Sequence, residues 1–209
     1  KELKAALIYY NENLYFNKAL HYLSFKTRSI YEVRSYLQNK GLEDPSNIIS
    51  RLQNLGYLDD KAFAEGLLDY AISNYKGPLY LKGKLTEKKV ASEIIEDVLN
   101  KYNPNLEEQI IDEKVSKAAK KLTIYPIIKQ KQKLIAKLMR DGFTYDLIFN
   151  KINSHPLIDE SDEKLQNDYQ KLKTRYQKKN ISDYELKQKL IANLLNKGYD
   201  YQKIISIIE

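Results

Sequence analysis

Two stretches of the chain carry the same pattern: KQKLIAKLMRDGFTYDLIFNKI, from Lys131 to Ile152, and KQKLIANLLNKGYDYQKIISII, from Lys187 to Ile208. They agree at half of their positions without a gap. In each stretch, apolar residues recur at helical spacing before a glycine and again after it. Because glycine readily adopts the left-handed conformation that ends a helix, each stretch predicts a helix, a tight turn and a second helix. Internal repeats decide the architecture of a chain, and these repeats predict an all-α fold.

Weaker copies of the same pattern occur earlier in the chain. The turn position falls at Gly41, Lys89, Gly142 and Gly198, so lysine replaces glycine in the second copy. An amphipathic helix precedes each helix pair, at about residues 12–25, 60–75, 106–122 and 162–179. We therefore expect four tandem three-helix bundle repeats, at residues 1–58 (with an N-terminal segment), 59–103, 104–155 and 156–209. Since a unit of about 50 residues has little core of its own, stacking the units would bury more surface and give an elongated, curved array.

The sequence offers little for catalysis. It has no cysteine, two histidines outside any metal-binding motif, and seven glycines without a phosphate-binding loop. Acidic pairs such as Asp59 and Asp60 stand at expected helix starts, where capping explains them. We therefore expect no enzyme activity, no catalytic residue, no metal and no cofactor. No apolar run reaches the roughly 18 residues of a membrane helix, so we expect no membrane partner. The absence of cysteine fits a reducing cytoplasm.

Positive charge is concentrated in the second half of the chain. Nine lysines and arginines lie from Lys114 to Arg140 without an acid among them, and five lie from Lys171 to Lys179. We expect a helix from about residue 126 to 140. Its spacing assigns five apolar residues to the core face: Ile127, Ile128, Leu134, Ile135 and Leu138. The candidate contact residues for an acidic partner lie on the opposite face and on one face of the second run: Lys129, Lys133, Lys137, Arg140, Lys171, Arg175 and Lys178. Lys131 lies beside the apolar stripe and can instead extend over the core. The alternative is that both runs are solvated helix faces.

A nucleic acid is the other class of acidic partner. Tyr125 precedes the basic helix and Tyr176 lies within the second basic run, and tyrosine beside lysine can stack on unpaired bases. The same tyrosines also fit the edge of a core, and Tyr176 continues the core spacing of Tyr169 and Leu172. The short helices after the turns are poor in side chains that read base edges. Sequence-specific DNA binding is therefore disfavoured, whereas non-specific phosphate contact stays open.

The first half of the chain resembles the RecX family of regulatory proteins. The resemblance is carried by an ordered set of short matches: Ala19-Leu20, Tyr22-Leu23-Ser24, Arg28-Ser29, Glu32, Leu37, Lys40-Gly41, Leu55-Gly56-Tyr57-Leu58-Asp59-Asp60, Phe63-Ala64, Gly77-Pro78, Leu85, Ile94-Ile95-Glu96 and Leu99. These are mostly cap and core positions, which are weak individually and specific as a set. Two departures stand out, since Lys89 replaces the usual glycine and four units exceed the three expected of a compact member.

The resemblance implies a regulator that docks along the groove of the RecA recombinase filament. Such a protein inhibits filament growth, the filament's ATP hydrolysis and strand exchange, without catalysis of its own. It would act in DNA recombination, DNA repair and the SOS response, as a cytoplasmic protein. The expected partner is the RecA filament, and single-stranded DNA is the second candidate. A monomer is expected, because stacked repeats bury their own faces. The alternative function is a non-sequence-specific single-stranded DNA-binding protein that competes for the DNA.

Overall fold

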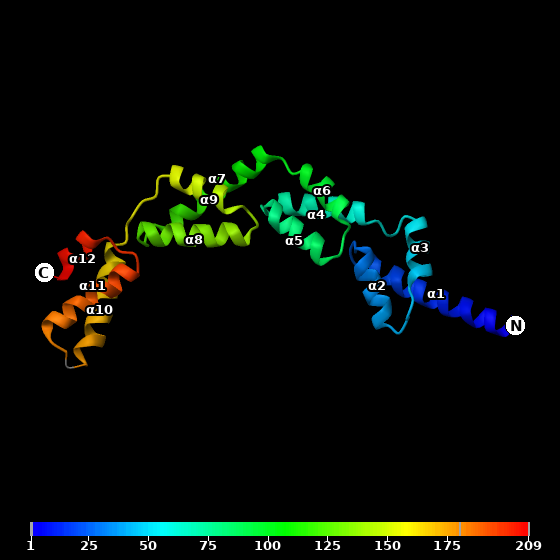
Figure 1. Cartoon of the computed structure of the whole chain (residues 1–209), viewed down its shortest axis with the longest axis horizontal. Helices are drawn as coiled ribbons and strands as arrows, with labels where there is room; N and C mark the ends of the chain where they lie inside the picture. The colour runs from blue at the N-terminus through cyan, green and yellow to red at the C-terminus, as the bar shows by residue number, and fades with distance from the viewer. Residues whose placement is uncertain (1, 180, 209) are drawn as a thin grey trace. The chain divides into compact units, whose positions relative to one another are not determined.

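The computed structural model describes residues 2–179 and 181–208, and that part of the chain contains twelve helices and no strand (Figure 1). The helices are α1 (Glu2–Ser24), α2 (Ile30–Asn39), α3 (Ser46–Asn54), α4 (Asp60–Ser73), α5 (Pro78–Glu87), α6 (Ser92–Asn100), α7 (Pro104–Leu122), α8 (Ile127–Arg140), α9 (Tyr145–Ser154), α10 (Asp162–Gln177), α11 (Asp183–Asn196) and α12 (Tyr201–Ile208). The predicted all-α fold is confirmed.

Successive groups of three helices pack around separate apolar cores. Helices α1–α3 form bundle 1, α4–α6 bundle 2, α7–α9 bundle 3 and α10–α12 bundle 4. In bundle 3, for example, Ile111 and Val115 of α7 meet Leu134 and Leu138 of α8 and Ile148 of α9. The tandem arrangement of three-helix bundles is thereby confirmed. The repeat boundaries that we placed at residues 58, 103 and 155 stay a prediction.

The chain divides into two compact units, unit 1 at residues 1–103 and unit 2 at residues 104–209. Bundles 1 and 2 belong to unit 1, and bundles 3 and 4 belong to unit 2.

The second helix of every bundle ends in the same left-handed turn. Gly41, Gly142 and Gly198 have φ angles of 95°, 93° and 89°, and Lys89 takes the equivalent position with a φ of 56°. In bundle 2, the Lys89 N–H donates to the carbonyl of Thr86 at 3.0 Å, and the next N–H donates to the carbonyl of Leu85 at 3.2 Å. The glycine turns make the same two bonds. Lysine therefore keeps the turn geometry, although its Cβ makes the left-handed conformation costly.

In unit 1, a buried polar contact joins bundles 1 and 2. Ser29 is fully buried at the start of α2, where it forms a capping box with Glu32, and its hydroxyl donates to the carbonyl of Lys88 at 3.1 Å. The Lys88 ammonium lies 3.1 Å from the Glu32 carboxylate. Burial opposes ionisation of Glu32, but the Ser29 N–H, Lys88 and Arg28 outweigh it and hold its pKa below the ordinary value.

Asp60 makes a second contact across the same joint. Its carboxylate accepts a hydrogen bond from the N–H of Ile30 at 2.8 Å, so the first residue of α4 binds the first residue of α2. Burial raises the pKa of Asp60, and the neighbouring carboxylates of Asp59 and Glu32 raise it further. At this joint the pKa of Glu32 is therefore lowered, whereas the pKa of Asp60 is raised.

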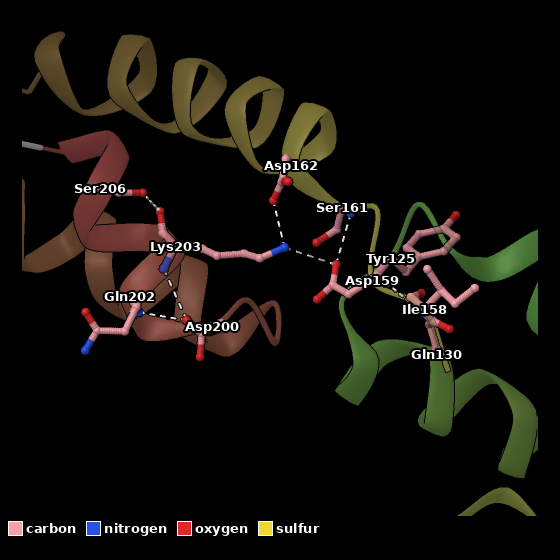
Figure 2. A network of polar contacts seen from close by, with 10 residues as sticks. All are labelled: Tyr125, Gln130, Ile158, Asp159, Ser161, Asp162, Asp200, Gln202, Lys203 and Ser206. Carbon is pink, nitrogen blue, oxygen red and sulfur yellow. Dashed lines mark hydrogen bonds and ion pairs between the residues drawn. The ribbon is translucent and has the colours of Figure 1, made fainter. Parts of the chain in front are cut away.

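In unit 2, the segment between α9 and α10 is fastened to bundle 3. Gln130 of α8 is fully buried, and its amide N–H₂ donates to the carbonyls of Tyr125 at 2.7 Å and Ile158 at 2.6 Å (Figure 2). The N–H of Glu160 donates to the carbonyl of Thr123 at 2.8 Å. These bonds tie the connecting segment to both ends of the α7–α8 turn.

Lys203 of α12, in bundle 4, binds the same connecting segment. Figure 2 shows its ammonium between two carboxylates, Asp162 at 2.7 Å and Asp159 at 3.6 Å. The Asp162 hydrogen bond chiefly raises the pKa of Lys203. Burial opposes ionisation of Asp159, but hydrogen bonds from Ser161 and the charge of Lys203 outweigh it, so the pKa of that carboxyl is lowered. Bundle 4 is therefore joined to bundle 3 through Lys203 of α12 and through the connecting segment that precedes α10.

Candidate partner-binding site

Helix α8 presents to solvent a face whose charged residues are all basic. Its buried side chains include Leu134 and Leu138, whereas Lys133, Lys137 and Arg140 are exposed. No acidic residue lies within α8, so the helix itself contributes no compensating charge. Like charges four residues apart on a helix repel each other, which weakens the helix slightly. Binding of an acidic partner by this face would account for this loss of stability.

Helix α7 adds cations to this face and forms a groove with α8. The groove, of about 670 Å³, is lined by five cationic side chains: Lys117, Lys121, Lys133, Lys137 and Arg140. Its apolar lining is provided by Ala118 and Leu122 of α7 and by Leu134 and Ala136 of α8. We call this feature the basic groove. The sequence analysis did not select Lys117 and Lys121, although their spacing of four residues, away from the core stripe of α7, was a usable signal.

One ion pair connects the two walls of the basic groove, and others connect α9 to α7. Lys114 of α7 forms an ion pair with Asp141, which directly follows α8, and both side chains are largely buried. Lys151 of α9 lies 3.0 Å from Glu108 and 2.8 Å from Asp112, so α9 is also tied to α7. The groove is therefore a fixed feature of bundle 3.

Lys129 and Lys131 lie apart from the basic groove. Lys129 is exposed at the start of α8, where its ammonium donates to the side chain of Gln132 at 3.4 Å. Lys131 is half-buried and donates to the side chain of Asn153 on α9 at 2.7 Å. Of the four α8 candidates, the structure places Lys133, Lys137 and Arg140 in the groove and separates Lys129 from them.

The α10 candidates form a second basic face. Lys171, Arg175 and Lys178 are exposed, at spacings of four and three residues that lie along one side of the helix. Lys164 continues this side toward the start of α10, seven residues before Lys171. The sequence analysis missed Lys164, because it lies among acids outside the basic run.

Tyr125 connects the two basic faces. Its ring centroid lies 4.6 Å from the ammonium of Lys133 and 5.0 Å from the ammonium of Lys164. The ring therefore takes part in cation–π contacts with bundles 3 and 4 at once. Tyr176, by contrast, is buried and its hydroxyl accepts a hydrogen bond from Asn193 at 2.9 Å, which agrees with the core interpretation.

Unit 1 has a different hollow, of about 450 Å³, between its two bundles. Aromatic side chains of α4 and α5 line it together with lysines, which include Lys84 and Lys88. Both lysines are paired with acids, since Lys84 lies 2.8 Å from Glu87 and Lys88 binds Glu32. The charge there is largely compensated, and the stronger candidate for binding an anionic partner is the basic groove.

No group of three or more histidine, cysteine, aspartate or glutamate side chains that could hold a metal ion occurs within residues 2–179 and 181–208. Over those ranges, no helix has the length and apolar character needed to cross a membrane.

Comparison with known proteins gives one consistent family. Residues 16–46 match the family model described as RecX, first three-helix domain, and residues 59–99 match RecX, second three-helix domain. The chain is 33% identical to the regulatory protein RecX of Streptococcus agalactiae serotype V, over 98% of this chain and 79% of the relative. It is 34% identical to the regulatory protein RecX of Halalkalibacterium halodurans, over 90% of this chain and 73% of the relative.

Solved structures agree with these sequence matches. The crystal structure of RecX from Lactobacillus salivarius superposes with a TM-score of 0.61 and 28% identity, covering 68% of this chain and 94% of that one. Another crystal structure, of regulatory protein RecX, gives a TM-score of 0.63 at 21% identity over 74% of this chain and 78% of that one, and it supports the fold alone.

Proposed function

The chain belongs to the RecX family of regulatory proteins, and from this premise we propose that it binds the groove of the RecA–DNA filament and inhibits the recombinase. The protein would inhibit filament growth, ATP hydrolysis and strand exchange. The observation that carries the proposal is the basic groove, most of whose cations have no acidic partner, together with the second basic face on α10, so that positive charge lies on two successive bundles. A filament that carries DNA offers a long, repeated acidic surface for such charge.

Several bundles in one chain favour a filament over a free recombinase subunit. Once one bundle is bound, the next is held at a high effective concentration near the neighbouring subunit. Weak contacts by single bundles can then sum to tight binding on the filament. A free recombinase subunit would bind one bundle at a time, so its binding would be weak.

The proposal includes the setting and the state of the protein. We expect a cytoplasmic monomer without catalysis of its own, acting in DNA recombination, repair and the SOS response. Four separate cores, each filled by the three helices of one bundle, support a chain that folds without a second copy. Light scattering at micromolar concentration tests the monomer, since a dimer would double the mass.

A second candidate function is non-specific binding of single-stranded DNA. The arrangement of Tyr125 between Lys133 and Lys164 favours it, because aromatic rings flanked by cations are used to bind unpaired bases and their phosphates. Under this alternative the protein would inhibit recombination by covering the DNA. Its binding would then fall steeply with salt and would need no recombinase.

One titration separates the two candidates. The rate of DNA-dependent ATP hydrolysis by RecA filaments is measured as the protein is added, and binding to the same bare single-stranded DNA is measured in parallel. Inhibition at concentrations that leave bare DNA unbound supports filament binding. Inhibition that begins only when the DNA is covered supports the alternative.

A charge-matched pair of variants locates the surface involved. Lys137→Gln with Arg140→Gln removes two charges from the basic groove, and Lys82→Gln with Lys187→Gln removes two exposed charges from α5 and α11. Glutamine preserves helix propensity in both pairs. The proposal expects the first pair to weaken inhibition about tenfold or more and the second to leave it nearly unchanged. Equal losses would show that only net charge matters.

A further inference from the structure

The basic groove combines a charged rim with an apolar floor. Leu134 is fully buried, Leu122 and Ala118 are half-buried, and Ala136 is exposed on the α8 wall. Two of these four floor residues are alanines, which leave room for another chain to approach the helix backbones closely. Phosphate groups would use the rim but would gain nothing from apolar side chains below it.

Most of the rim charge has no acidic partner within bundle 3. Lys117 forms an ion pair with Glu113, and Lys133 packs over Tyr125. Over the described part of the chain, Lys121, Lys137 and Arg140 form no ion pair with an acid. Such a set of neighbouring cations repels itself and weakens the isolated fold. The natural complement is a segment that brings carboxylates to the rim.

Bundle 4 supplies an internal comparison for the rim. The sequence repeat aligns Lys137 with Asn193 and Arg140 with Asn196, while the core leucines at 134 and 138 recur at 190 and 194. Asn193 is used locally, since its amide donates to the carbonyl of Lys189 at 2.8 Å. The same three-helix scaffold therefore folds without these cations, so the fold does not require Lys137 and Arg140.

From these observations we propose that the basic groove binds an acidic amphipathic helix of a protein partner. The helix would lay its apolar stripe on Ala118, Leu122 and Ala136, above the buried Leu134, and direct its carboxylates to the rim cations on both sides. Bundle 3 would then acquire a fourth helix, which is the common solution for helices with matching apolar faces. The rim from Lys133 to Arg140 spans about 10 Å of α8, enough for two turns of the bound helix.

The groove lining offers no aromatic platform for unpaired bases. Its walls contain neither an aromatic ring for stacking nor an amide for reading base edges. Tyr125 contacts Lys133 from outside the groove lining. This separates the groove from the Tyr125 region, where single-stranded DNA would find its contacts.

The inference deepens the proposed function by specifying the kind of segment that the partner presents, and its test uses no recombinase. The probe is a fluorescein-labelled model peptide of about 18 residues, with leucine and alanine along one helical face and glutamate along the others. A peptide of the same composition in scrambled order keeps the charge and removes the stripe. Binding of both to the full chain is followed by fluorescence anisotropy, together with a labelled oligothymidylate.

Ala136→Leu is the decisive variant, because it fills the floor of the groove and changes no charge. Leucine is a good helix former and Ala136 is exposed, so the variant is expected to fold. The inference expects the amphipathic peptide to bind at least about tenfold more tightly than the scrambled one, and Ala136→Leu to abolish that difference. Oligothymidylate binding should not change. Equal binding of the two peptides, or unaltered peptide binding by Ala136→Leu, would overturn the inference.

The Lys137→Gln, Arg140→Gln pair provides a further readout. Removing repulsive charges should leave the melting temperature equal or higher while peptide binding weakens. A lower melting temperature would show that these cations serve the fold, which contradicts the inference. If the peptide fails to bind while the wild-type protein still inhibits RecA, the groove assignment is wrong and the proposed function stands.

Discussion

Replacing Lys89 by glycine is expected to stabilise unit 1. Lys89 has a φ of 56°, whereas glycines occupy the equivalent turns of the other three bundles. The left-handed conformation costs a residue with a Cβ about 1 to 2 kcal/mol, and glycine offsets about 0.5 to 1 kcal/mol of this gain because it loses more freedom on folding. The two backbone hydrogen bonds of the turn do not depend on the side chain. The net gain in free energy of unfolding is therefore about 0.5 to 1 kcal/mol.

This gain is measurable by thermal unfolding followed by far-UV circular dichroism. For a unit of about 100 residues it corresponds to a rise of about 2 to 8 °C in the melting temperature of unit 1. Lys89→Ala is the matched control, since it removes the same charge and keeps the Cβ. If alanine raised the melting temperature as much as glycine, the side chain rather than the backbone would be the source of the cost. No rise with glycine would refute the inferred strain at this turn.

Three further outcomes test the joints within each unit. Gly198→Ala should lower the free energy of unfolding of unit 2 by about 1 to 2 kcal/mol, because φ is 89° and the added Cβ would lie 3.4 Å from the Cβ of Ile128; an unchanged urea midpoint would contradict this. Glu32→Gln should cost about 1 kcal/mol at neutral pH. Because the folded-state pKa of Glu32 is lowered, that difference should start to shrink as the pH falls below the ordinary value of about 4.3, and it should vanish once the pH is below the lowered folded-state pKa; a difference that persists in strong acid would exclude the charge as its cause. Gln130→Met should leave two backbone carbonyls unpaired at a cost of about 2 kcal/mol and speed hydrogen exchange at the Glu160 N–H, whereas unchanged exchange would show that the joint holds without the amide.

The sequence predicted the bundles because each one is built from local signals. The core leucines of α8 and α11 and the glycines that end these helices recur at one spacing, and helical periodicity assigns them directly. The equivalent of the glycine at Lys89 was also predicted, from the flanking apolar pattern. Its left-handed conformation follows from the surrounding turn, which imposes on lysine the geometry that glycine adopts easily.

The contacts between bundles were beyond the same reasoning. Ile128 was assigned to the core of its helix, but its side chain is 57% exposed and lies beside Gly198 of bundle 4. Gln130 was not singled out by the sequence analysis, yet it is fully buried and binds the connecting segment. Periodicity describes one helix and its own bundle, whereas both residues lie at the joint between bundles 3 and 4.

The candidate site was predicted in part for the same reason. Helical spacing grouped Lys133, Lys137 and Arg140 correctly, but it could not separate Lys129, whose end of α8 lies outside the groove. The groove itself needs the second wall from α7, and its apolar floor is visible only when both helices are placed. The periodicity of one helix is therefore enough to predict a cluster of charges. The shape of the groove, which decides the partner that fits, depends on the placement of two helices.

The internal repeat separates what the fold needs from what binding needs. Six of the eleven positions that recur between bundles 3 and 4 are leucines, isoleucines and the turn glycine, which the scaffold requires. Lys133 and Ala136 of the groove also recur, as Lys189 and Ala192. The rim positions 137 and 140 change to asparagine in bundle 4, so the two bundles offer different surfaces on one backbone plan. A partner that engages both bundles would therefore be bound through two unlike contacts. Under this reasoning each contact can stay weak and selective, and only an assembly that presents both surfaces at the right spacing is bound tightly.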